Sequence, residues 1–294
     1  FIFSLIIILL TPGWSVFASE KSPGNLYALS AVLMDGDSGR VLYQKSGNTP
    51  RPNASTTKVM TCILALENGK GDDYVKVSAN AVSQPEVRLG LSIGEQYYLE
   101  DLLYSLMLQS HNDSAVAIAE HIGGSVEGFS ALMNEKAKAI GAVHSHFANP
   151  NGLTNPDHYT TAEDMALISA YAMKNPDFRD VVKRKTYPMT YRNGIYRNVE
   201  NRNEFLSSGY PGANGIKTGM TEAAGDCLVA SAERDGRLVI VTLYNDPNRW
   251  NDTKAWLDYG FRAAKAREKY DAEMAAEPKV YKFVNQVLGR EARA

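Results

Sequence analysis

The sequence predicts an α+β fold, in which one antiparallel sheet is built from both ends of the chain and a helical lobe is inserted between them. Three observations support this prediction. A strand-hairpin pattern lies near the N-terminus, helical periodicities fill the middle of the chain, and a second β-rich pattern follows them. The length of 294 residues is sufficient for a full core and fits one large domain or two small ones.

The first element in order is a hairpin. Two short apolar runs, 31–34 and 40–43, flank the sequence DGDSG, whose residues suit a tight reversal. From Thr56 onward, apolar residues recur at helical spacing until Asn68 and Gly69. This predicted helix is apolar on more than one side, so we expect it to lie inside the core.

A block of helices is expected next. The 3.6-residue period is present in four segments, 102–108, 114–122, 129–140 and 162–173. Thr160 and Glu163 form a candidate capping box for the last of them.

A second hairpin and a closing helix complete the predicted fold. The β-rich runs 227–232 and 238–244 are joined through Arg234, Asp235 and Gly236. An amphipathic helix is predicted from about Thr253 to Lys265, before a polar tail rich in Ala and Glu.

The chain begins with features of an export signal. Residues 1–10 are almost entirely apolar, and Val16 and Ala18 suit a signal peptidase that cuts after Ala18. The apolar run is short for a span, although an N-terminal membrane anchor is the alternative. We therefore expect residues 1–18 to be a signal peptide, N-terminally truncated in this sequence.

Composition excludes several classes of function. The formal net charge is −2 and acidic and basic residues are mixed along the chain, so we expect no nucleic-acid partner. His144 and His146 have no accompanying ligand set, so we expect no metal. Cys62 and Cys227 either form one long-range bridge or are two buried thiols, and the second is favoured because free cysteine packs as a small hydrophobe.

Ser55 and Lys58 carry the first chemical motif. At this spacing on a helix, the hydroxyl and the amine lie on one face within reach of each other. A lysine in a water-poor site can have its pKa lowered enough to take the serine proton. The N–H of Ser55 at the helix start is a natural oxyanion donor. A helix-start serine beside a solvated lysine is the structural alternative, but the turns after Lys58 are apolar.

Lys217, Thr218 and Gly219 form a second motif, which chance produces less often than Ser-x-x-Lys. On a strand beside the nucleophile, they would supply a positive charge, a hydroxyl for a carboxylate, and room for the substrate against the backbone. The structural alternative is a surface strand end with a turn glycine.

A third pattern, Ser-x-Asn, occurs at 46–48, 78–80 and 110–112. The first precedes the nucleophile, and the second follows a short strand pattern. Ser110 and Asn112 lie between two apolar helices, where a loop can turn inward, so we choose them.

With these three motifs in view, the sequence resembles the D-alanyl-D-alanine carboxypeptidases among the low-molecular-mass penicillin-binding proteins. The likeness runs from about Leu29 to Phe261. It includes the stretches PNASTTKVMT, LQSHNDSAVAIAEHIGG, NPNGL, GIKTGMTEAAGDCLVASAE and LDYGF.

The resemblance implies a penicilloyl-serine transferase fold and a role for each site residue. Ser55 would be the acylated nucleophile and Lys58 its base. Ser110 and Asn112 would line one wall of the cleft, and Lys217, Thr218 and Gly219 the other. The resemblance also implies an oxyanion hole from the backbone N–H groups of Ser55 and Met220, and Arg249 helping Thr218 to hold the substrate's terminal carboxylate.

Two departures from the family affect the cleft and the chain end. His111 stands where the family often has a small residue, so it is expected to alter the cleft or add a titrating group. About thirty residues follow Phe261, where the family commonly adds a second domain and an anchoring helix. The charge pattern of residues 279–288 is too weak for an anchor. We expect a catalytic domain at 25–265 and a tail, or the start of another domain, at 266–294.

The resemblance predicts a serine-type D-Ala-D-Ala carboxypeptidase without a cofactor. Its partners would be peptidoglycan stem peptides ending in D-Ala-D-Ala, with β-lactams as covalent inhibitors, in an extracytoplasmic location where peripheral membrane association is left open. Alternatives are an endopeptidase or transpeptidase, a β-lactamase, and a catalytically silent peptidoglycan-binding protein. The sequence lacks the Glu-x-x-Leu-Asn pattern of class A β-lactamases, and the intact motifs argue against a silent protein.

Overall fold

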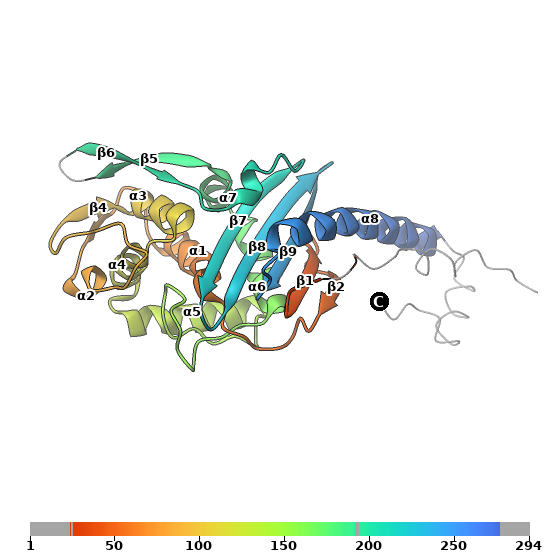
Figure 1. Cartoon of the computed structure of the whole chain (residues 1–294), viewed down its shortest axis with the longest axis horizontal. Helices are drawn as coiled ribbons and strands as arrows, with labels where there is room; N and C mark the ends of the chain where they lie inside the picture. The colour runs from red at the N-terminus through yellow and green to blue at the C-terminus, as the bar shows by residue number, and fades with distance from the viewer. Residues whose placement is uncertain (1–23, 25, 192–193, 277–294) are drawn as a thin grey trace, which may run out of the picture.

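A five-stranded antiparallel sheet forms the centre of the computed structural model, which describes residues 24, 26–191 and 194–276 (Figure 1). The strand order is β2-β1-β9-β8-β7. The strands are β1 (Ser30–Asp35), β2 (Val41–Lys45), β7 (Ala213–Thr221), β8 (Gly225–Arg234) and β9 (Arg237–Tyr244). Strand β1 pairs with β9, and Ser30 lies opposite Tyr244. The prediction of one sheet built from both chain ends is confirmed.

The two faces of the sheet are covered by different layers. Alternate residues of a strand point to opposite faces, so β9 contributes to both. Val241 and Leu243 belong to a smaller core that contains Trp256 of helix α8 (Arg249–Ala276). Ile240 belongs to the larger core on the other face. Burial on both faces explains why the strand is apolar along its length.

The helical lobe covers the face opposite α8. Its helices are α1 (Lys58–Asn68), α2 (Ala79–Val82), α3 (Leu99–Tyr104), α4 (Asn112–Gly123), α5 (Val126–Ile140), α6 (Ala162–Ala172) and α7 (Pro176–Lys183). Helix α6 contacts β1 and β9 directly, and α1 lies between α6 and α4. The predicted helix that begins beside Ser55 is therefore in the core, with only its last turn exposed.

Two small two-stranded sheets and the helices α2 and α7 were not predicted, although the sequence analysis noted a short strand pattern before Ser78, where β3 lies. Strands β3 (Tyr74–Lys76) and β4 (Gln96–Tyr98) form one sheet, with α2 in the segment that joins them. Strands β5 (Thr186–Tyr191) and β6 (Ile195–Glu200) form the other, a hairpin that extends over the helical lobe (Figure 1). The first pair is too short to show a period. In β6 only Val199 is buried, so its sequence carries no apolar alternation.

The helix predicted over 102–108 is two different pieces. Helix α3 ends at Tyr104, and a π-helical turn, Ser105–Gln109, follows it. Ser110 then adopts a left-handed conformation with φ of 66°. This change of winding ends the helix and directs the next residues inward, a use that is typical of π turns near functional sites.

The predicted capping box at the start of α6 is wrong. Thr161 caps this helix, because its side chain accepts a hydrogen bond from the backbone N–H of Asp164. The hydroxyl of Thr160 instead contacts that of Ser145 at 2.6 Å. The tertiary contact therefore outweighs the local pattern that pairs Thr160 with Glu163.

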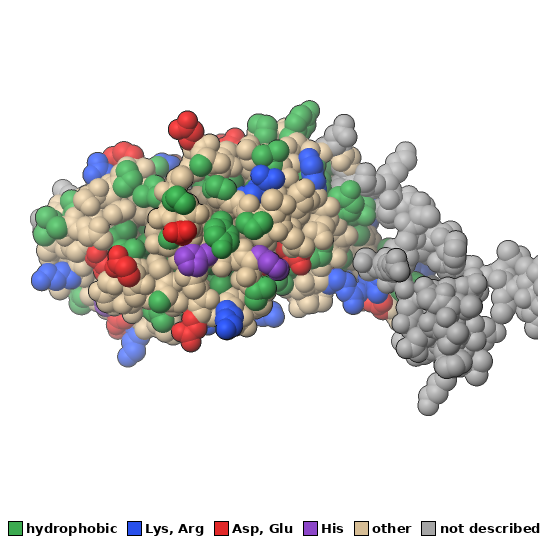
Figure 2. Space-filling model, turned by 90° about the horizontal axis from the view of Figure 1, so that it is seen from below, with side chains coloured by type: hydrophobic (Ala, Val, Ile, Leu, Met, Phe, Trp, Pro, Cys, Tyr) green, Lys and Arg blue, Asp and Glu red, His purple; other side chains and the backbone are tan. Residues whose placement is uncertain are grey.

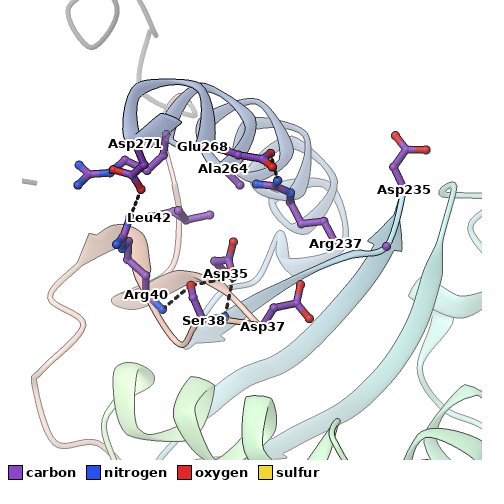
Figure 3. Close-up of a pocket in the computed structure, with 12 residues that line it drawn as sticks. Asp35, Asp37, Ser38, Arg40, Leu42, Asp235, Arg237, Ala264, Glu268 and Asp271 are labelled. Carbon is purple, nitrogen blue, oxygen red and sulfur yellow. Dashed lines mark hydrogen bonds and ion pairs between the residues drawn. The ribbon is translucent and has the colours of Figure 1, made fainter. Parts of the chain in front are cut away.

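Helix α8 continues well past residue 265, where the sequence analysis ends it. Its outer part lies over the turns at one end of the sheet (Figure 3). There Arg40 contacts Asp271 at 3.1 Å, and Arg237 forms an ion pair with Glu268. The pocket of about 500 Å³ among these side chains shares no lining residue with the cleft described below.

The surface agrees with the mixed charge of the sequence. On the face seen from below, acidic, basic and hydrophobic side chains are interspersed over the described residues (Figure 2). Among the helices that the structure describes, none has the length and apolar character to cross a membrane.

Candidate active site

Ser55 lies in a 3-10 turn, Ala54–Thr57, that leads directly into α1. Lys58 is the first residue of α1 and is fully buried, and its Nζ lies 2.8 Å from the Oγ of Ser55. The structure therefore brings together the hydroxyl and the amine of the Ser-x-x-Lys motif. The serine precedes the α-helix, rather than starting it, because the turn at its position is tighter.

Three oxygen atoms surround the amine of Lys58. Besides the Oγ of Ser55, these are the Oδ1 of Asn112 at 2.9 Å and the backbone carbonyl oxygen of Asn151 at 2.8 Å. Every contact of the amine is thus with a polar atom inside the protein, which is the condition for burying such a group at all.

The electrostatic surroundings weaken the basicity of both lysines of the site. Burial lowers the pKa of Lys58 well below its ordinary value, and the charges of Lys217 and Arg202 lower it further. The pKa of Lys217 is lowered to about 7, first by burial and then by Arg202 and Arg249. An amine whose pKa is lowered in this way can exchange its proton near neutral pH.

The structure distinguishes the three Ser-x-Asn patterns. Only the residues of the 110–112 pattern border the cleft that contains Ser55. Ser78 caps α2 by accepting a hydrogen bond from Ala81, and Ser46 is exposed after β2. The choice of pattern made from the sequence agrees with this placement.

Ser110 and Asn112 form one wall of the cleft. The Oδ1 of Asn112 contacts Lys58, and its Nδ2 donates to the carbonyl of Pro85 at 3.1 Å, which fixes the orientation of the amide. The Oγ of Ser110 is buried and has no hydrogen-bond partner within the described residues. A buried hydroxyl left in this state is available to a substrate.

His111 does not alter the cleft in the way expected from the sequence. Its ring is buried, its Nδ1 lies 2.7 Å from the Oγ of Ser105, and it does not line the cleft. Burial lowers its pKa to about 4. The expectation of a titrating group in the cleft is therefore wrong, because the left-handed turn at Ser110 directs residue 111 into the core.

Strand β7 forms the opposite wall with Thr218 and Gly219, whereas Lys217, expected from the sequence to be part of this wall, does not line the cleft. Lys217 is buried below the cleft, and its Nζ donates to the carbonyl of Thr218 at 3.0 Å. A Cβ on Gly219 would lie 3.0 Å from the backbone nitrogen of Ser55. Glycine is thus the residue that lets the strand approach the nucleophile turn so closely.

Met220 and Arg249 complete this wall. The side chain of Met220 is 67% exposed at the cleft. Arg249 opens α8, before the predicted start at Thr253, and its Nη1 contacts Asp226 at 2.9 Å and the carbonyl of Gly219 at 3.2 Å. Arg249 therefore lies beside the strand, as the resemblance implies, and is held there by protein groups.

The cleft has a volume of about 660 Å³ and contains residues that the sequence analysis did not identify. They are Glu86, Val87, Asn151, Gly152, Leu153, Arg202, Glu204 and Thr221. The stretch NPNGL marks three of them, since an Asn-Gly pair signals a turn and Gly152 has a φ of +81°. Arg202 and Glu204 carry no such local signal.

The cysteines and histidines singled out in the sequence lie apart from this chemistry. Cys62 and Cys227 are buried free thiols, and burial raises the pKa of Cys227 to about 12. His144 lies 3.7 Å from Asp164, and His146 is in a strand bridge. No cluster of three metal-ligating side chains is found among the described residues.

Comparisons with known proteins agree with this geometry. Residues 17–248 match the peptidase family S11, described as D-alanyl-D-alanine carboxypeptidase. The chain is 36% identical over 273 residues to D-alanyl-D-alanine carboxypeptidase DacF of Bacillus subtilis, which covers 87% of this chain and 68% of that protein. It is 35% identical over 264 residues to the D-alanyl-D-alanine carboxypeptidase of Streptomyces strain K15, covering 83% of this chain and 90% of that one.

A solved structure shows the same fold. The crystal structure of a D-alanyl-D-alanine carboxypeptidase from Mycobacterium tuberculosis superposes with a TM-score of 0.78 at 31% identity, over 83% of this chain and 94% of that chain. The predicted fold of the penicillin-binding proteins is thereby confirmed. The chain belongs to the D-alanyl-D-alanine carboxypeptidase family of serine peptidases, the low-molecular-mass penicillin-binding proteins.

Proposed function

We propose that Ser55 is the nucleophile of this D-alanyl-D-alanine carboxypeptidase and that Lys58 is its general base. The observation that carries the proposal is the 2.8 Å contact between Lys58 Nζ and Ser55 Oγ inside the cleft. The hydroxyl oxygen attacks the carbonyl carbon of the D-Ala-D-Ala bond while its proton passes to the amine.

Burial and nearby positive charge favour a neutral amine at Lys58, and its neighbours direct that amine toward the nucleophile. A neutral amine has two N–H groups and one lone pair. The amide oxygen of Asn112 and the carbonyl oxygen of Asn151 only accept hydrogen bonds, so they take both N–H groups. The lone pair is then left for the hydroxyl of Ser55, which is the arrangement that a base requires.

The backbone N–H groups of Ser55 and Met220 stabilise the oxyanion in this proposal. The close approach of Gly219 to the nitrogen of Ser55 supports it, because turn and strand meet at this point. The tetrahedral intermediate collapses when D-Ala leaves with the proton held by Lys58. Water then attacks the acyl-serine and gives a proton to Lys58. Lys58 passes this proton to the Oγ of Ser55 as the ester bond breaks, which restores both residues and releases the shortened peptide.

The charged end of the cleft holds the terminal carboxylate of the substrate. Thr218 supplies a hydroxyl and Arg249 supplies a positive charge, since both line the cleft. Lys217 is buried behind them and supports Thr218 by donating a hydrogen bond to its carbonyl. The contacts of Arg249 with Asp226 and Gly219 support a fixed position for its guanidinium group. A β-lactam presents a similar carboxylate and acylates the same serine.

The substrate determines the location of the enzyme. The family acts on peptidoglycan, so the enzyme works outside the cytoplasm. Residues 1–18 are an export signal in this proposal, supported by the apolar run of residues 1–10, and they lie outside the described residues. The boundary proposed at 265 lies within α8, so we extend the catalytic domain to Ala276.

Release of D-Ala from a pentapeptide that ends in D-Ala-D-Ala tests this function. The wild type and a Ser46→Ala variant, which changes an exposed serine outside the cleft, are expected to release D-Ala at equal rates. Ser55→Ala is expected to release none while it keeps the wild-type circular dichroism. Release by a folded Ser55→Ala variant contradicts the proposal.

A further inference from the structure

His158 lies buried behind the nucleophile turn, and the mechanism above makes no use of it. Its side chain is 4% exposed. Its Nδ1 accepts a hydrogen bond from the backbone N–H of Ala148 at 3.1 Å. In a neutral imidazole the proton is then on Nε2, which lies 2.8 Å from the Oγ1 of Thr57. His158 therefore donates a hydrogen bond to Thr57.

Thr57 links this histidine to the catalytic pair. It lies between Ser55 and Lys58 in the chain, and it is fully buried. Its Oγ1 also accepts a hydrogen bond from the Nδ2 of Asn53 at 2.8 Å. Two donors from different segments thus fix one oxygen of the turn that carries the nucleophile.

Ala148 and His158 flank a loop, residues 149–157, that packs against the same turn. Asn151 in this loop accepts the hydrogen bond from Lys58 through its backbone carbonyl. The next residue, Gly152, lies so close that a Cβ there would be 1.9 Å from the carbonyl oxygen of Ala54. The placement of the Asn151 carbonyl therefore depends on how the loop is held against the turn.

We propose that His158 is a positioning residue, which holds the 149–157 loop against the nucleophile turn. The Asn151 carbonyl then stays in place to accept an N–H of Lys58, and the lone pair of that amine points toward the hydroxyl of Ser55. This inference rests on the proposed roles of Ser55 and Lys58. His158 touches neither the substrate nor the reacting atoms and acts through Thr57 and the loop.

The charge state of the histidine agrees with this role. The pKa of His158 is lowered to about 4, first by burial and then by the charges of His146 and Lys58. The imidazole is neutral at neutral pH, so its Nδ1 can accept from Ala148. The ring edge against Phe147, with centroids 5.7 Å apart, adds an apolar contact that keeps water away.

Three variants separate positioning from mere packing. His158→Leu removes both hydrogen bonds and keeps an apolar side chain. His158→Gln preserves them, because an amide presents one acceptor and one donor at a similar separation. His144→Gln is the matched control, since His144 is exposed and contacts neither Thr57 nor the loop. The measured quantity is the acylation rate constant with a fluorescent penicillin, as a function of pH.

We expect His158→Leu to lower the acylation rate constant by about tenfold, because small displacements of a catalytic group have large effects. The pH midpoint of the rate is expected to move upward, since a loosened loop admits water to Lys58 and its pKa returns toward the ordinary value. His158→Gln should stay within about threefold of the wild type, as should the control. A folded His158→Leu variant with the wild-type rate and midpoint overturns the proposal.

Thr57→Val, alone and combined with His158→Leu, provides a second test, and the single variant keeps the proposal testable if His158→Leu does not fold. Thr57→Val removes the oxygen that accepts from His158 and keeps the side-chain shape. It is expected to produce the same upward shift of the midpoint. Where His158→Leu does fold, adding it to Thr57→Val should slow acylation no further. An unchanged midpoint in Thr57→Val, or additive losses in the double variant, refutes the link. Absence of penicillin labelling at Ser55 in the wild type would instead refute the proposed function.

Discussion

Two lysines of this enzyme are buried almost entirely away from water. In the proposed mechanism, this burial is what allows Lys58 to act as a base. Lys58 and Lys217 are both within the core, and each has its pKa lowered mainly by the loss of water. A group whose charged form is disfavoured on folding reduces stability. The same loss of solvent allows Lys58 to be unprotonated beside Ser55. The site therefore exchanges stability for reactivity.

The cost of burying Lys217 can be measured directly. Because its pKa falls from 10.5 to about 7 on folding, the cost is fully present below pH 7 and decreases as the pH rises toward 10.5. Lys217→Met is expected to raise the free energy of unfolding by about 1–3 kcal/mol at about pH 6, and by less at about pH 9, while acylation by penicillin is lost. Urea unfolding at the two pH values tests this, and an equal gain at both contradicts it.

Among single residues, the sequence identifies mainly those whose side chains have a role in the proposed mechanism. Ser55 and Lys58 are recognisable because their spacing matches a helical turn. Asn151 is different, since only its backbone carbonyl contacts Lys58 and any residue has one. Arg202 reaches the cleft from a segment without periodicity, so no pattern in the sequence indicates it.

At the scale of elements, the predicted helices and strands are correct where their apolar pattern is long. The two hairpins of the central sheet and the helices from α4 to α6 belong to this group. The π turn at Ser105–Gln109 has a helical sequence, and only the packing of the surrounding lobe sets its winding. Short strands such as β4 contain too few residues to show a period.

Helix α8 is held to the sheet by apolar burial far more than by its ion pairs. Trp256 is 1% exposed and meets the ring of Tyr43 edge-on, with centroids 5.3 Å apart. Trp256→Ala is expected to reduce the free energy of unfolding by about 3–5 kcal/mol. Glu268→Gln breaks the exposed pair with Arg237 and is expected to cost less than about 1 kcal/mol. If urea unfolding shows that the two substitutions reduce the free energy of unfolding by similar amounts, the predominance of apolar burial is contradicted.

For the molecule as a whole, the cleft is assembled from distant parts of the chain. The turn of Ser55, the start of α4, the 149–157 loop and β7 are far apart in sequence and meet beside β7, the edge strand of the sheet. The pairing of β1 with β9 brings the chain ends together and closes this arrangement. Loss of the global fold therefore removes the site.

Acid is expected to destabilise the whole molecule through two buried histidines. The pKa of His111 and that of His158 are each lowered from 6.5 to about 4, so the unfolded chain binds more protons between these values. Stability is therefore complete above about pH 6.5 and decreases as the pH falls toward 4. Urea unfolding should show this slope in the wild type. The double variant His111→Gln with His158→Gln should show a shallower one, and an unchanged slope contradicts the assignment.

The central claim is that the hydroxyl of Ser55, activated by Lys58, is the group that becomes acylated. Mass spectrometry of peptides from the penicillin-treated protein measures this most directly. We expect one penicilloyl adduct, on the peptide that contains Ser55, and none after Lys58→Met has removed the base. An adduct on any other residue, or acylation of a folded Lys58→Met variant at the wild-type rate, would contradict the account.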